Sequence, residues 1–195
     1  MTVYSKTVPD EKYRALRDKF FTSLTADEFH AVEFYLSSGY KSINHYLMDA
    51  STLADKETSR SFDDIIKSMT IALTRHNPDS CFPTLFRGAR QQHVNHFQVG
   101  EEVSFPFFMS TTTDPLVAVR FAGEEEPAVL IVKGVNGSCA PISLNSHENE
   151  VIISPSSRFT VQSITEGVSF QAEYDNSGFY APARKNVTVI EMTVL

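Results

Sequence analysis

Apolar residues recur at helical spacing through the first third of the chain. One helix is predicted over Lys12 to Phe21, which contains no breaking residue, and a second begins at Thr25. Thr25 and Glu28 have the spacing of a capping box, in which each side chain binds the backbone N–H of the other residue. Gly39 is expected to end this helix. The apolar positions that recur at helical steps are Phe29, Val32, Leu36, Tyr40, Ile43 and Leu47.

A further helix is predicted between Ser61 and the sequence His76-Asn77-Pro78. Ser61 can cap its start. The residue before a proline disfavours helical geometry, so the helix should close there. Its apolar positions again share one face: Phe62, Ile65, Ile66, Met69 and Leu73.

After Pro83 the pattern changes to short apolar or β-branched runs between clusters of Gly, Pro, Asn and Ser, which is typical of strands and turns. One helix interrupts them, with Asp114 as its cap, Pro115 in its first turn and Leu116 to Ala122 as its body. The predicted strands are Thr84–Arg87, Val103–Met109, Ala128–Lys133, Glu150–Ile153, Arg158–Ile164 and Val187–Val194.

These elements predict an α+β protein. A helical lobe near residues 1–80 should pack on a β-rich core from about residue 81 to 195. The length fits one domain of ordinary size, and we expect residues 1–195 to form a single domain. A cleft between the lobes, or across the β part, is the expected place for a ligand.

Composition narrows the function classes. The net charge is −7 and no basic cluster occurs, so binding to nucleic acid is not indicated. No stretch approaches the roughly 20 apolar residues of a membrane span, and the first residues lack the apolar run of a secretory signal. Cys81 and Cys139 are the only cysteines, which gives no disulfide framework and no evident catalytic pairing with histidine.

The sequence Glu148-Asn149-Glu150 places two carboxylates one residue apart, directly before the apolar run Val151–Ile153. In a strand, residues two apart point to the same side, so both carboxylates can face one point. Like charges held this close raise each other's pKa, and work on a glycosidic bond would be a reason for the arrangement. A solvated loop with two unrelated glutamates is the other interpretation of this tripeptide alone.

Two further motifs end apolar runs. Arg87-Gly88 offers a planar fork of donors suited to phosphate, next to a glycine that lets a ligand approach the backbone. Ser110, Thr111 and Thr112 place three hydroxyls just before the helix at Asp114, where they can orient a neighbouring carboxylate. Taken singly, the arginine also fits a surface turn, and the hydroxyls also fit strand propensity and helix capping.

The three motifs occur in the order arginine, hydroxyls, glutamates, and each adjoins an apolar strand. This pattern resembles the arginine–serine–glutamate class of mono-ADP-ribosyltransferases. That class includes bacterial toxins and effectors, phage-encoded transferases and vertebrate ecto-enzymes. The resemblance covers roughly residues 25 to 165 and implies an ADP-ribosyltransferase-like fold, with the helical lobe packed on a mixed two-sheet β core. Thr112 stands where the family commonly has a second serine, and keeps the hydroxyl. The other segments that agree are Ser38–Leu47, Val117–Ala122, and Glu150–Pro155 followed by Phe159.

The resemblance implies NAD as co-substrate and no metal. Arg87 would bind the NAD phosphates, and Gly88 would present backbone groups to the nicotinamide amide. Ser110 would hold Glu150, which bonds the ribose 2′-hydroxyl and stabilises an oxocarbenium-like transition state. The remaining residues expected at the NAD site are Thr111 and Thr112, which support the pocket, and Phe121, which borders the nicotinamide or else packs within its helix.

The acceptor is implied by Glu148. In this family a glutamate at that position goes with arginine as acceptor, because a guanidinium with pKa above about 12 needs a carboxylate to orient it and take its proton. The expected partner is therefore a target protein with an exposed arginine, met by a mobile loop at Ser143–His147. A soluble effector, toxin subunit or phage enzyme that acts in a host-cell cytoplasm is the expected setting.

Other functions stay open at this point. The same pocket can pass ribose to water and act as an NAD glycohydrolase, or the chain can be a non-catalytic interaction module that keeps only the fold. The poly-ADP-ribose polymerase branch has a histidine in place of Arg87 and a tyrosine in the second motif, and this chain has neither. His93 and His96 have a spacing compatible with metal ligands, but lack the H-E-x-x-H pattern and a neighbouring cysteine.

Overall fold

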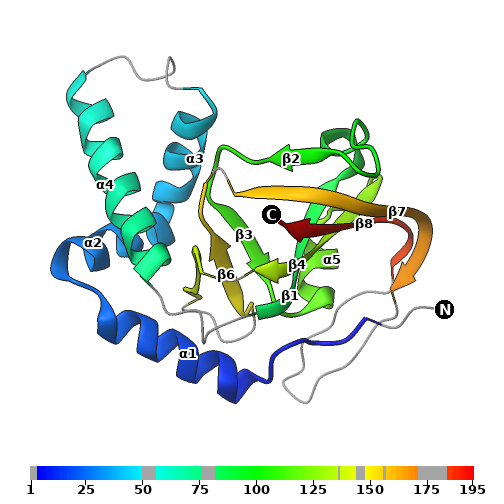
Figure 1. Cartoon of the computed structure of the whole chain (residues 1–195), viewed down its shortest axis with the longest axis horizontal. Helices are drawn as coiled ribbons and strands as arrows, with labels where there is room; N and C mark the ends of the chain where they lie inside the picture. Colours follow the sequence, from blue (N-terminus) through cyan, green and yellow to red (C-terminus); the bar gives the residue numbers. More distant parts are fainter. Residues whose placement is uncertain are drawn as a thin grey trace.

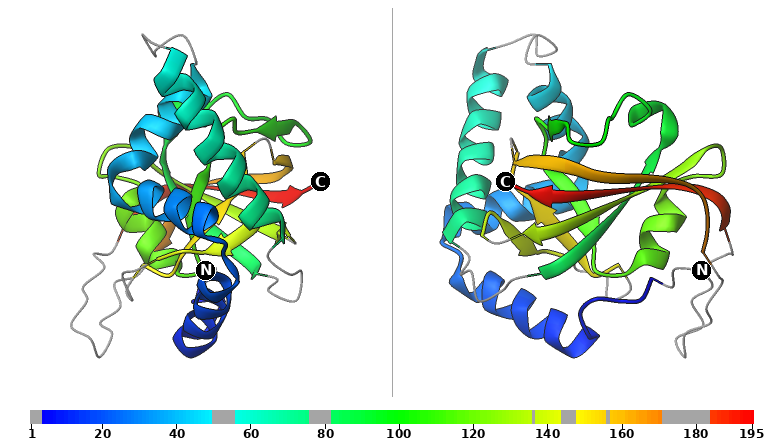
Figure 2. Two further views of the ribbon diagram at one scale, coloured as in Figure 1. Left: turned by 90° about the vertical axis from the view of Figure 1, so that its left-hand side faces the viewer. Right: turned by 45° about the vertical axis from the view of Figure 1, so that its right-hand side comes forward.

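The computed structural model describes residues 4–49, 56–75, 82–135, 137–143, 148–155, 157–170 and 184–195. Its N-terminal part is helical, as predicted. The helices are α1 (Asp10–Ser23), α2 (Ala26–Phe34), a π-helix η1 (Tyr35–Gly39), α3 (Tyr40–Met48) and α4 (Lys56–Arg75). Figure 1 shows α2, α3 and α4 grouped at one side of a β-sheet, with α1 running beneath it, and the turned views of Figure 2 keep this arrangement.

The helix starting at Thr25 has the predicted capping box. The Thr25 hydroxyl accepts from the Glu28 amide at 3.4 Å, and a Glu28 carboxylate oxygen accepts from the Thr25 amide at 2.8 Å. The predicted end at Gly39 is wrong, because Gly39 has helical backbone angles and the chain passes through η1 directly into α3. A Cβ there would lie 2.2 Å from the Phe34 ring, so close packing explains this glycine.

The boundaries of the last helix in this lobe also differ from the prediction. Helix α4 begins at Lys56, before Ser61, so Ser61 does not cap it. The helix is described as far as Arg75, and the predicted closing sequence His76-Asn77-Pro78 lies outside the described residues. Among the parts that the structure describes, no helix combines the length and the hydropathy of a membrane span.

The β part forms a mixed sheet with the order β2-β7-β8-β4-β1-β3-β6-β5. Together with the helices, this sheet makes the protein α+β, which confirms the predicted fold class. Two sheets were expected; the described strands instead connect in one order, but β1 and β3 share a single register pair, Phe86 with Thr112. The strands are β1 (Phe82–Arg90), β2 (Glu102–Ser104), β3 (Met109–Thr112), β4 (Pro127–Val135), β5 (Cys139–Pro141), β6 (Glu150–Ile153), β7 (Arg158–Phe170) and β8 (Arg184–Val194).

Two strand predictions need correction. The run Val103–Met109 is not one strand, because Pro106 lies between β2, which pairs with β7, and β3, which pairs with β6. Proline has no N–H to donate to a ladder, which disfavours an unbroken strand through this run. Strand β5 was not predicted, since its three residues carry no periodic signal. The remaining strands occur at the predicted positions, although β1, β4, β7 and β8 are longer than predicted. Helix α5 (Pro115–Phe121) also occurs as predicted, capped by the Asp114 carboxylate at the Leu116 amide.

A shared apolar core joins the helical lobe to strands β5 and β6 and to Phe108, the residue before β3. Phe108 and Ile152 are fully buried there against Ile43 of α3 and other helical residues. Asn44 adds a polar link, because its side chain accepts from the Phe108 amide at 3.1 Å and donates to the Phe108 carbonyl at 3.2 Å. The helices are therefore fixed against the residues that lead into β3.

Replacing Asn44 should loosen this junction. Asn44→Ala leaves both backbone groups of the buried Phe108 without these partners, and we expect the free energy of unfolding to fall by about 1–3 kcal/mol. Urea denaturation would measure it, with His45→Ala, an exposed position on the same helix, as the control. Equal stability of the Asn44→Ala and His45→Ala proteins would contradict the role of this link.

Candidate active site

A cavity of about 550 Å³ opens between the helical lobe and the sheet. Every residue predicted from the sequence to form the NAD site lines it, although these residues come from four separate elements and a turn. They are Arg87, Gly88, Ser110, Thr111, Thr112, Phe121, Glu148 and Glu150. The size lies in the range of small-molecule and cofactor sites.

Strands β3 and β6 set the relative positions of the hydroxyls and Glu150. In their antiparallel ladder Glu150 is opposite Thr112, and Ser110 lies two residues further along β3. Opposite residues and residues two apart share a face of the sheet, so the three side chains point the same way. The Ser110 hydroxyl is near both the Glu150 carboxyl and the Tyr35 hydroxyl, and its hydrogen bonding acts to lower the pKa of each.

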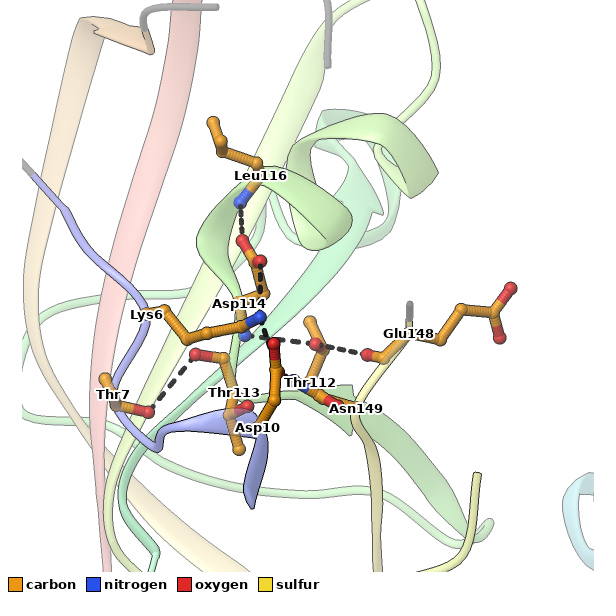
Figure 3. Close-up of polar contacts among 9 residues, drawn as sticks. All are labelled: Lys6, Thr7, Asp10, Thr112, Thr113, Asp114, Leu116, Glu148 and Asn149. Carbon is orange, nitrogen blue, oxygen red and sulfur yellow. Dashed lines mark hydrogen bonds and ion pairs between the residues drawn. The ribbon is translucent and has the colours of Figure 1, made fainter. Parts of the chain in front are cut away.

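Glu148 is not part of the strand, which corrects the expected geometry. It lies in a turn, and Asn149 has a left-handed backbone angle of φ 43° before β6 begins at Glu150. The alternation of an extended strand therefore does not explain why both carboxylates reach the cavity. The turn is held instead by the Thr112 hydroxyl, which donates to the Glu148 carbonyl at 2.6 Å (Figure 3).

Arg87 lines the cavity and is partly buried. Its Nη1 donates to the Ser110 carbonyl at 2.7 Å, and its Cζ lies 5.5 Å from the centre of the Phe107 ring. Burial lowers the pKa of this guanidinium, whereas nearby Tyr35 and Glu150 act to raise it. One part of the donor fork is thus used to fix the side chain, which orients the remainder.

The structure gives Gly88 a different reason from the one expected. A Cβ at this position would lie 2.2 Å from the Ala118 carbonyl oxygen and 2.5 Å from the Ala122 amide nitrogen. Glycine is therefore required for the close packing of β1 against helix α5. The backbone of Gly88 does line the cavity, but its missing side chain makes room for the helix.

The environment of Glu150 disfavours its charge. Burial raises the pKa of this carboxyl, and the neighbouring charge of Glu148 raises it further, while the hydrogen bond from Ser110 and the charge of Arg87 oppose the shift. Burial likewise raises the pKa of Tyr35 to about 12, so that its hydroxyl stays protonated. A partly buried carboxylate beside a hydroxyl donor is suited to meet a positive charge.

Among the supporting residues, Thr111 and Thr112 use their hydroxyls on the backbone. Thr111 donates to the Val151 carbonyl at 2.6 Å, which ties β3 to β6. Phe121, for which packing within its helix was one expectation, is 58 % exposed and borders the cavity. The aromatic surface it offers there is available to a planar ligand.

Four cavity residues of the helical lobe were missed as site residues: Tyr35, Leu36, Tyr40 and Asn44. Helical periodicity predicted their helix but not which face would meet the sheet. Arg120 was also missed. Its Nη2 lies 4.0 Å from Oε1 of Glu148, so a guanidinium already stands beside this carboxylate.

The alternative metal interpretation gains no support. Within the described ranges, no group of three or more His, Cys, Asp and Glu side chains could hold a metal ion. His93 ends a short 3-10 helix and His96 packs against the ring of Phe97. Cys139 is buried in β5, and Cys81 lies outside the described residues.

Comparison with known proteins gives the family. The chain matches the model of the ADP-ribosyltransferase exoenzymes over residues 10–178, and it belongs to this family. It is 30 % identical over 159 residues to a Vibrio splendidus (strain 12B01) protein named as an NAD(+)–arginine ADP-ribosyltransferase, Vis. That match covers 74 % of this chain and 61 % of Vis, so the chain spans less than two thirds of this curated relative.

Solved structures agree on the fold. The crystal structure of Vis in complex with agmatine has a TM-score of 0.63 at 24 % identity, over 95 % of this chain and 84 % of that one. The enzymatic component C2-I of the Clostridium botulinum C2 toxin has a TM-score of 0.72 at 17 % identity, over 97 % of this chain and 47 % of that one. The helical lobe packed on a mixed sheet is thus the fold of these enzymes.

The burial of Glu150 predicts a pH-dependent gain in stability for Glu150→Gln. Because the folded protein holds this proton more tightly than the unfolded chain, stability falls as pH rises from the ordinary value of 4.5 through the folded-state pKa. The gain from glutamine should therefore be complete above the folded-state pKa and vanish below 4.5.

Melting temperatures of both proteins at about pH 8 and about pH 4 measure this difference. Glu102→Gln, with a side chain 60 % exposed, is the control and should show no such gain. A gain that persists unchanged in acid would show that the charge of Glu150 is not the cause.

Proposed function

We propose that this protein transfers ADP-ribose from NAD to an arginine side chain of a target protein and releases nicotinamide. The observation that carries the proposal is the meeting of Arg87, Ser110, Glu148 and Glu150 around one cavity in a chain of the ADP-ribosyltransferase exoenzyme family. The choice of arginine is supported by Vis, whose solved complex contains agmatine, a small molecule that ends in a guanidinium group.

The reaction breaks the bond between nicotinamide and the ribose. Nicotinamide is already cationic in NAD, so it leaves without a general acid, and the ribose C1 becomes oxocarbenium-like. Glu150 supplies the negative charge beside this carbon and a hydrogen-bond acceptor for the ribose 2′-hydroxyl. Ser110 keeps the carboxylate in place, and Arg87 with its remaining donors holds the phosphates.

Glu148 acts on the acceptor arginine. A guanidinium nitrogen of the target forms the new bond to C1, and its proton passes to the Glu148 carboxylate as the nicotinamide bond breaks. The contact between Glu148 and Arg120 at 4.0 Å supports this role, because it shows a guanidinium within reach of the same carboxylate. An incoming arginine would take the place that Arg120 now occupies.

We also propose that residues 1–195 form one catalytic domain that acts inside a host cell, as an effector, a toxin subunit or a phage enzyme. The resemblance to the toxin component C2-I supports this setting at the level of fold. Surface loops rather than the catalytic motifs select the target. Incubation of the protein with labelled NAD and a cell lysate tests the function: a labelled protein band means transfer, and free ADP-ribose alone means NAD hydrolysis.

Substitution of the two glutamates should affect transfer and NAD cleavage differently. Glu150→Gln should reduce transfer and NAD cleavage together, by a factor of about 10² to 10³, because it removes the charge that meets the cation. Glu148→Gln should abolish transfer to agmatine yet leave NAD hydrolysis, since water needs no guanidinium base. Nicotinamide release and ADP-ribosyl-agmatine formation measure the two activities, and equal loss of both in Glu148→Gln would refute the division of roles.

Arg87 should act mainly through NAD affinity. Loss of charge-assisted hydrogen bonds in Arg87→Ala should raise the Kd for NAD about tenfold or more. Calorimetric titration of NAD measures it, with Arg90→Ala as the matched control, because Arg90 is exposed at the end of the same strand and does not line the cavity. Unchanged affinity in Arg87→Ala would place the phosphates elsewhere.

A further inference from the structure

The segment from Lys6 to Arg17 runs along the turn that carries Glu148 and Glu150, although more than a hundred residues separate the two in the sequence. Figure 3 shows Lys6, Thr7 and Asp10 beside Thr113, Asp114 and Asn149. The Thr7 amide donates to the Thr113 carbonyl at 2.9 Å, which places this segment next to the end of β3. None of these N-terminal residues lines the cavity.

Tyr13 of α1 holds the Glu150 end of the turn. Its hydroxyl donates to the Glu150 carbonyl at 2.5 Å and accepts from the Ser143 amide at 3.1 Å. The side chain is 1 % exposed, and burial raises the pKa of its hydroxyl, which keeps the donated proton in place. The Glu150 carbonyl also accepts from the Ile142 amide at 3.0 Å, so this backbone group is held from two directions.

Asp10 holds the middle of the turn. The Asn149 side-chain amide donates to Oδ1 of Asp10 at 2.6 Å, and Lys6 donates to the same oxygen at 2.7 Å. Asn149 is 1 % exposed, and it has a left-handed backbone angle between the two glutamates. Asn tolerates this angle, but its side chain needs a partner when buried.

We infer that Tyr13 and Asp10 are positioning residues that clamp the Glu148–Glu150 turn. Tyr13 acts through Glu150, and Asp10 acts through Glu148. This inference rests on the proposed function. Tyr13 fixes the backbone from which the Glu150 side chain extends and thereby the cleavage of NAD. Asp10 fixes Asn149 and thereby the direction of Glu148, which governs the share of ADP-ribose that passes to an arginine rather than to water.

The geometry supports this division over a purely structural role for α1. Both contacts lie on the turn itself, at the backbone of one glutamate and at the residue between the two. Arg17 also donates to the Ser143 carbonyl at 3.4 Å, and Ser143 is the residue whose amide binds the Tyr13 hydroxyl. Displacement of about 1 Å at a reacting group is enough to cost a large factor in rate.

Steady-state kinetics with NAD and agmatine test the clamp. Tyr13→Phe should lower kcat for NAD cleavage about tenfold, while the KM for NAD stays within about twofold. Asp10→Ala should leave NAD cleavage within about twofold but reduce the ratio of transfer to hydrolysis about tenfold. Asp10→Asn keeps an oxygen that can accept from Asn149 and should restore that ratio.

Two controls separate positioning from stability. Tyr46→Phe removes another tyrosine hydrogen bond, to Asp63 at 2.9 Å in the helical lobe, away from the cavity. Leu73→Val weakens the buried core of that lobe. If Tyr13→Phe loses no more kcat than these controls, or if Asp10→Asn behaves like Asp10→Ala, the clamp is refuted. A wild-type protein that releases no nicotinamide would instead refute the proposed function.

Discussion

Glu150 carries a carboxylate in a place that disfavours its charge. Burial and the nearby Glu148 raise its pKa, and a hydrogen bond from Ser110 and the charge of Arg87 only oppose that shift. Such an arrangement lowers the stability of the resting protein and is relieved when a positive charge appears beside it. The oxocarbenium-like carbon of NAD is a charge of this kind, and it exists only while the bond to nicotinamide breaks.

Much of the surrounding fold holds this one side chain. The β3–β6 ladder places Ser110 and Glu150 on one face, and Tyr35 of the helical lobe lies near Ser110. Asn44 fixes the lobe to the residue at the entrance of β3. The helical lobe and the sheet therefore meet at the cavity, where the reacting groups need fixed distances.

The sequence was most informative where a local signal decides the structure. The capping box at Thr25, the cap at Asp114 and the run Glu150–Ile153 have such signals, and the structure has them at these positions. Predictions failed where distant packing decides: Gly39 continues a helix because the Phe34 ring lies against it, and Gly88 makes room for α5. No local pattern contains that information.

Local sequence patterns were also insufficient to predict the geometry of the site. Apart from Asn149, the residues of the three motifs line the cavity. The reason given for the two glutamates was wrong, because Asn149 has a left-handed backbone angle. Tyr13, Tyr35 and Arg120 were missed, since their contacts with the motif residues arise only when segments far apart in the chain fold together. Resemblance predicted the reacting groups, and the structure is needed to see what holds them.

The most direct measurement is a crystal structure of the Glu150→Gln protein with NAD bound, because glutamine keeps the shape of the side chain while the substrate stays intact. The account predicts the nicotinamide ribose inside the cavity, with the side chain at position 150 within about 3.2 Å of the 2′-hydroxyl and Arg87 at the phosphates. NAD bound outside the cavity, or with its ribose turned away from position 150, would contradict it.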